Sequence, residues 1–121
     1  MLPTVATVLV SLVALIHIGI AVVEIFLWKL PQVHSRLGFS AEQAKKAAPI
    51  VANAGLYNSF LAAGLIWGLG SPMAGSQIQL FFLACVVIAG LFGAVTLKPT
   101  TLAIQTLPAA LAMGVLWMSR S

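Results

Sequence analysis

Two ionisable side chains, His17 and Glu24, interrupt the first long apolar stretch of the sequence. A charged carboxylate inside a membrane span costs at least about 2.5 to 3.5 kcal/mol, so it must face other helices, pair or take up a proton. On an α-helix the two residues lie within about 20° of one another and about 10.5 Å apart along the axis. That separation excludes a metal ion held by these two alone, because each ligand atom lies about 2 Å from the metal. It suits a small molecule or a water chain between a proton donor and a proton acceptor.

Polar side chains of two later apolar stretches are expected at the same depth as Glu24. Asn53 and Tyr57 share a helical face near the start of one stretch, and Gln105 lies about one turn into another. Near Gln105, Pro108 frees a backbone carbonyl that needs a partner. These positions predict a polar chamber that opens to the cytoplasm, with His17 at its deep end and with Glu24, Asn53, Tyr57 and Gln105 along its walls.

Asn58 points about 100° away from Tyr57, and we expect it to form a hydrogen bond between helices. One intramembrane histidine cannot supply both axial ligands of a haem, so haem would require a second subunit. We expect no metal and no other cofactor. The sequence contains no nucleophile elbow, phosphate-binding loop, cysteine cluster or HExxH pattern. The single cysteine, Cys85, is expected to be a small packing residue.

The composition determines the kind of element that must position these residues. The chain has 121 residues, of which 61% are hydrophobic and 7% are charged, with a mean hydropathy of +1.10. A soluble domain carries about 25% charged residues, so this composition excludes one. It predicts an all-α membrane protein, a single domain with a four-transmembrane-helix bundle whose spans cover residues 2–28, 50–69, 78–97 and 101–118. Ser40 and Gln43 have the spacing of a capping box, which predicts a short cytoplasmic interfacial helix over residues 41–47.

The basic residues indicate the orientation of the chain. Of the six Lys and Arg residues, five lie on the first and third connections and only Arg120 follows the last span. By the positive-inside rule, these two loops face the cytoplasm of a bacterial inner membrane and both termini lie outside. Because the basic residues flank apolar spans and form no patch with aromatic residues, we expect no nucleic-acid partner.

Small residues recur at fourfold spacing on three of the expected helices. Gly64 and Gly68 form one such pair, Ala110 and Gly114 form another, and Cys85 begins a similar series on the third span. Such positions allow helices to approach closely in lipid. Packing within the chain is favoured over a face for a second copy, and the oligomeric state stays open.

Two stretches of sequence carry a resemblance to a known family. Residues 17–28 read HIGIAVVEIFLW and residues 53–68 read NAGLYNSFLAAGLIWG. In these stretches, and in the plan of nearly the whole chain, the sequence resembles the small bacterial membrane proteins grouped as domain of unknown function 1304. The resemblance implies a protein with four spans and implies no activity.

Three functions remain open from the sequence. We favour binding or transport of a small amphipathic molecule in the chamber, with Glu24 as the protonatable group. The first alternative is an intramembrane enzyme, such as an isomerase of a lipid-like substrate, with His17 and Glu24 as acid and base. The second is an accessory subunit whose loop helix, with Lys45 and Lys46, docks on a larger complex or on anionic lipid.

Overall fold

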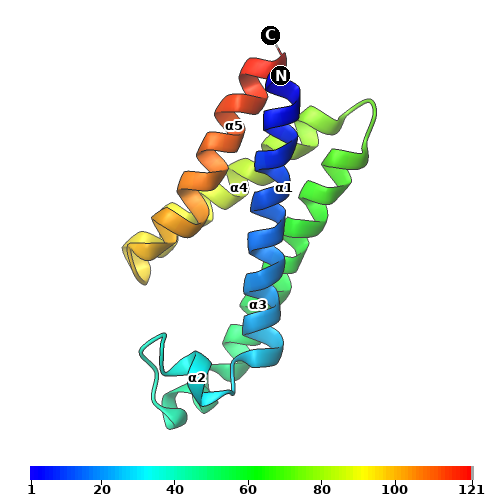
Figure 1. Cartoon of the computed structure of the whole chain (residues 1–121). Helices are drawn as coiled ribbons and strands as arrows, with labels where there is room; N and C mark the ends of the chain where they lie inside the picture. The colour runs from blue at the N-terminus through cyan, green and yellow to red at the C-terminus, as the bar shows by residue number, and fades with distance from the viewer. Residues whose placement is uncertain (121) are drawn as a thin grey trace. The chain divides into compact units, whose positions relative to one another are not determined.

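The computed structural model describes residues 1–120 and contains only helices and connections within them (Figure 1). Four of these helices are long and apolar enough to cross a membrane, as the composition predicts. The candidate spans are Leu2–Leu27, Ala41–Gly70, Gly75–Thr96 and Leu102–Arg120. The elements in chain order are α1 (Leu2–Val22), a π-helical segment (Val23–Leu27), α2 (Pro31–His34), α3 (Ala41–Gly70), α4 (Gly75–Thr96), a second π-helical segment (Leu102–Thr106) and α5 (Leu107–Arg120).

Helix α3 differs from the two helices expected over residues 41–47 and 50–69, because it runs without interruption through Pro49. The expected helix start is confirmed: the backbone N–H of Gln43 donates to Ser40 Oγ at 3.2 Å, and the N–H of Ser40 donates to Gln43 Oε1 at 2.9 Å. A proline inside a helix frees the carbonyl four residues earlier, here that of Lys45. Both Pro49 and Lys45 are exposed. The freed carbonyl can therefore be solvated, which removes the main reason for the helix to end.

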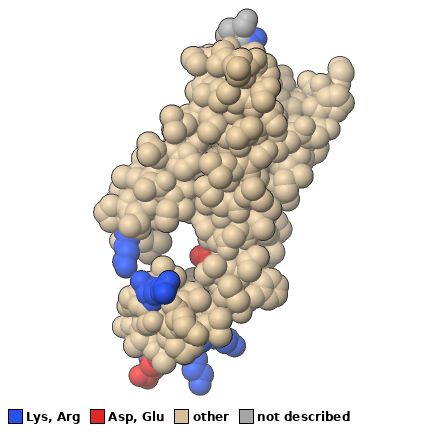
Figure 2. Space-filling view, in the orientation of Figure 1, with Lys and Arg blue, Asp and Glu red and all other residues tan. Residues whose placement is uncertain are grey.

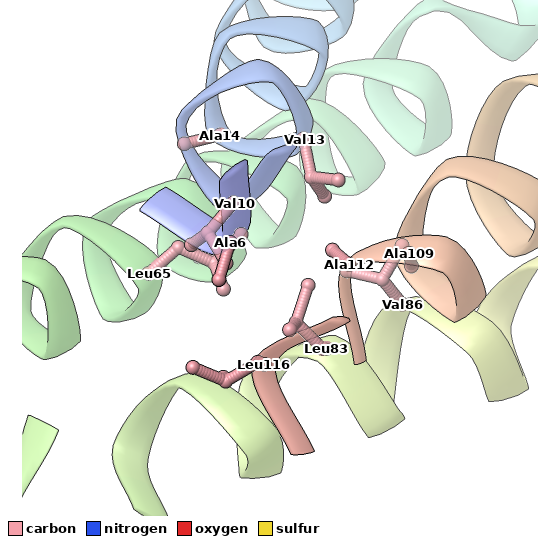
Figure 3. Packing of buried hydrophobic residues seen from close by; sticks show 10 residues of the cluster. All are labelled: Ala6, Val10, Val13, Ala14, Leu65, Leu83, Val86, Ala109, Ala112 and Leu116. Atoms are coloured by element: carbon pink, nitrogen blue, oxygen red, sulfur yellow. The ribbon is translucent and has the colours of Figure 1, made fainter. Parts of the chain in front are cut away.

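The chain consists of two compact units, and the described part of the first combines residues 1–16 with residues 61–120. Its core contains Val10, Leu65 and Leu83, each with no exposed surface, together with Ala109 and Ala112, also fully covered (Figure 3). These residues come from α1, α3, α4 and α5, so one apolar cluster joins all four long helices within this unit.

Glycines permit the close approach of α3 and α4 inside the first unit. A β-carbon on Gly64 would overlap the ring of Phe82, and one on Gly68 would lie 2.7 Å from Gln79 Cγ. Gln79 also donates from Nε2 to the carbonyl oxygen of Gly68 at 3.1 Å. The small-residue pair at 64 and 68 therefore packs within the chain. Gly114, by contrast, has nothing within 4 Å of the β-carbon position.

The second π-helical segment belongs to the first unit and ends two residues before Pro108. The N–H of Leu107 donates to the carbonyl of Leu102, five residues earlier, which is the π-helical pattern. Thr106 Oγ1 and Thr101 Oγ1 donate to carbonyls of α4 at 3.2 and 2.7 Å. Hydroxyl groups next to the irregular backbone thus tie this segment to α4.

Candidate functional site

The second compact unit, residues 17–60, contains the candidate site. Glu24 lies on the π-helical segment Val23–Leu27, inside the first candidate span. Its side chain is half-buried, and its Oε1 accepts a hydrogen bond of 2.7 Å from Asn58 Nδ2 on α3. Single-turn π-helical segments are frequent at functional sites because they change the direction of a side chain without ending the helix.

Gly55 sets the spacing between α1 and α3 at this pair. A β-carbon on Gly55 would lie 2.8 Å from Ile25 Cγ1, 3.0 Å from Glu24 Cβ and 3.3 Å from the carbonyl oxygen of Ala21. Asn58 follows Gly55 by three residues and so lies on the same helical face. The absence of a side chain at position 55 brings the backbone of α3 close enough for Asn58 to reach the carboxylate.

A hollow of about 290 Å³ lies beside Glu24. Besides Glu24 and Lys29, the lining residues are apolar and come from the end of the first span and the first half of α3: Ile25, Trp28, Ala48, Pro49 and Ala52. The hollow therefore has one acidic group, one basic group and mostly apolar walls, which is the usual make-up of a small-molecule site.

Trp28 is a fixed part of this wall. It is 5% exposed, and its indole Nε1–H donates to the carbonyl of Ala44 at 2.9 Å. The ring of Phe39 packs edge-to-face against it, with ring centroids 5.0 Å apart. A buried hydrogen bond and an aromatic contact hold the indole in one orientation, so the wall of the hollow is preorganised.

The connection between α1 and α3 supports Trp28 through a short folded loop. Within this loop, His34 is buried and its Nδ1 lies 3.2 Å from the carbonyl oxygen of Phe39. Gly38 has a φ of 86°, the left-handed conformation that glycine adopts without strain. This turn brings Phe39 back to Trp28. The loop around the site is thus held by side-chain contacts as well as by backbone hydrogen bonds.

Basic side chains surround the same loop. Lys29, Arg36, Lys45 and Lys46 are all exposed. On the face shown in Figure 2, the Lys and Arg atoms lie at helix ends and on connections, and the lengths of helix between them carry none. The unit therefore presents positive charge next to the end of an apolar span.

The structure brings only one of the predicted site residues, Glu24, to the hollow. His17 is on α1 with 0% exposure and is not among the lining residues. Asn53 is exposed, and Tyr57 is 59% exposed and packs against the ring of Phe60. Gln105 belongs to the other compact unit. A chamber shared by all these residues stays a prediction.

The hydrogen bond between helices that was expected of Asn58 is confirmed, and its acceptor is the carboxylate of Glu24. Asn53 and Tyr57 each lie two residues from Gly55, about 200° around the helix, so they point away from the face that meets α1. A series of small residues could have identified that face in the sequence: Ala48, Ala52, Gly55 and Ala62 recur at intervals of three, four or seven residues.

The geometry allows a defined set of chemical roles. Glu24 can accept hydrogen bonds or bind a cation, Lys29 can bind an anion, and the aromatic and aliphatic walls can bury an apolar body. Within residues 1–120, no three His, Cys, Asp or Glu side chains come together as a metal-binding group.

The family model described as "Protein of unknown function (DUF1304)" matches residues 11–117. Searches of curated proteins and of solved structures give no match. The matched range includes the residues that form the hollow.

Proposed function

The chain belongs to the family of proteins of unknown function DUF1304, and we propose that it binds or transports a small amphipathic molecule at the hollow beside Glu24. The observation that carries the proposal is the half-buried Glu24–Asn58 pair next to a hollow with apolar walls. A carboxylate in a candidate membrane span is a functional residue by default, because its presence there is costly.

Glu24 serves in this proposal as the group that gains and loses a proton when the ligand exchanges. Asn58 can accommodate both states, because its amide can donate to a carboxylate and can also accept from a carboxylic acid after a rotation. The hollow faces the cytoplasmic side of a bacterial inner membrane in this proposal. Support for that orientation comes from the five Lys and Arg residues on the first and third connections.

Binding is favoured over acid–base catalysis by the position of His17. An enzyme that used His17 and Glu24 as acid and base would need both groups within hydrogen-bond reach of one substrate. Glu24 lines the hollow, whereas His17 does not. A ligand seated in the hollow would therefore meet the carboxylate but not the imidazole.

The proposal is tested by proton flux in liposomes. The purified chain is reconstituted in phosphatidylcholine vesicles that contain a pH-sensitive dye, and two probes are added outside: tetraphenylphosphonium, a lipophilic cation, and a phospholipid with six-carbon chains. We expect at least one probe to produce a proton flux that depends on the protein and disappears in Glu24→Gln.

The matched control is Glu42→Gln, because it makes the same chemical change at an exposed position outside the hollow. Glu42→Gln is expected to retain the flux. An equal flux in Glu24→Gln and in the unaltered protein would refute the role of Glu24.

A further inference from the structure

The hollow lies at the level where a candidate span ends. Glu24 comes three residues before the last residue of the first span, Leu27, and Lys29 comes two residues after it. In a bilayer the hydrocarbon core gives way to the headgroup region at the ends of spans. The two charged groups of the hollow therefore lie near this boundary, where polar headgroups are found.

The two charges in the hollow do not neutralise each other. Among the described residues the hydrogen-bond partner of Glu24 is Asn58, and no ion pair joins Glu24 to Lys29. Both nevertheless line the same hollow. Because Glu24 and Lys29 share the hollow without forming an ion pair, one ligand can place a cationic group on Glu24 and an anionic group on Lys29.

The walls show which part of a ligand the hollow would enclose. Its volume of about 290 Å³ lies just below the range for small-molecule sites, about 300 to 1,000 Å³. That space holds a headgroup and the first part of an attached chain, and it is too small for a whole lipid. Ile25 and Trp28 supply apolar contact from one helix, and Ala48 and Ala52 supply it from the other.

From these features we infer that the hollow recognises a zwitterion: an ammonium group on the Glu24 carboxylate, an anionic phosphate on the Lys29 ammonium, and an apolar part against Trp28. This inference rests on the proposed function, namely that the hollow binds an amphipathic molecule. A ligand with only a cation would be repelled by Lys29, and a ligand with only an anion would be repelled by Glu24.

Binding can be measured with the fluorescence of Trp28. In a Trp67→Phe and Trp117→Phe background, Trp28 is the remaining tryptophan. Both replaced residues are exposed and lie outside the hollow. The protein is kept in nonionic maltoside micelles and titrated with three amphiphiles that carry six-carbon chains: phosphatidylethanolamine, phosphatidic acid and a dialkyl ammonium compound without phosphate.

We expect phosphatidylethanolamine to bind about tenfold more tightly than either of the other two, since each lacks one charge-assisted contact. In Glu24→Gln, phosphatidylethanolamine should bind no more tightly than phosphatidic acid. In Lys29→Gln, phosphatidylethanolamine should bind no more tightly than the ammonium compound. Lys45→Gln, which changes an exposed lysine outside the hollow, is the matched control and should leave all three affinities unchanged.

Free phosphoethanolamine distinguishes a lipid from a soluble ligand. Weaker binding of free phosphoethanolamine than of the lipid would support a lipid headgroup as the ligand, and equal binding would support a soluble zwitterion. The inference is overturned if phosphatidic acid or the ammonium compound binds as tightly as phosphatidylethanolamine. If no zwitterion binds while tetraphenylphosphonium still drives a proton flux that requires Glu24, this inference fails and the proposed function survives.

Discussion

Replacement of Gly55 by alanine tests whether the close approach of α1 and α3 positions Glu24. The new β-carbon would lie 2.8 Å from Ile25 Cγ1 and 3.0 Å from Glu24 Cβ, whereas ordinary contacts at such a position are 3.4 to 4 Å. The two helices must therefore separate by roughly 0.5 to 1 Å, a shift whose overpacking cost is about 1 to 3 kcal/mol. A shift of that size along the Asn58–Glu24 hydrogen bond would lengthen it from 2.7 Å to about 3.2 to 3.7 Å, at or beyond the upper limit of a good bond.

Gly19→Ala is the matched control because the same substitution there meets nothing within 4 Å. Alanine is favoured over glycine inside a helix by about 1 kcal/mol, and both variants gain this term. The difference between their free energies of unfolding therefore isolates the overpacking, about 1 to 3 kcal/mol. It can be measured by titrating each variant in maltoside micelles with sodium dodecyl sulfate and following the helical circular dichroism. Equal stability of the two variants would refute the argument from close approach.

Three further predictions concern contacts of the same unit. A double-mutant cycle of Glu24→Ala and Asn58→Ala should give a coupling energy of about 0.6 kcal/mol, and at most about 1.7 kcal/mol, in the unfolding titration, as polar pairs between membrane helices do; a coupling near zero would contradict the pairing. Trp28→Phe should lower the free energy of unfolding by about 0.5 to 1.5 kcal/mol because the carbonyl of Ala44 loses its donor. Hydrogen exchange at the start of α3 should accelerate, and an unchanged exchange rate there would contradict a stabilising role for this contact. Ser40→Ala should lower the free energy of unfolding by about 1 kcal/mol through loss of the cap. Faster hydrogen exchange should be confined to the first turn of α3, and unchanged exchange there would show that the capping box contributes nothing to stability.

The helical class and the four candidate spans could be predicted from composition, because long apolar segments in lipid must satisfy their backbone groups internally. The capping box at Ser40 and Gln43 could also be predicted, since it depends on local spacing alone. The continuation of α3 through Pro49 could not be predicted, because the penalty for a proline depends on whether the carbonyl of Lys45 is exposed. Exposure is a tertiary property.

The partner of Glu24 could not be chosen correctly by polarity alone. Tyr57 and Asn58 are adjacent and both polar, yet only the second shares a helical face with Gly55. The π-helical segment at Val23–Leu27 was also missed. It adds a residue to one turn and alters every angle that is calculated with 3.6 residues per turn, including the angle between His17 and Glu24.

The uninterrupted course of α3 makes it longer than the hydrocarbon core of a bilayer is thick. At 1.5 Å per residue its 30 residues extend about 45 Å, well beyond the roughly 30 Å thickness of a hydrocarbon core. The helix is therefore longer than it needs to be to cross such a core. A tilt of the first turns of α3, which carry Lys45 and Lys46, would be transmitted through its continuous backbone to Asn58, whose amide donates to the half-buried Glu24.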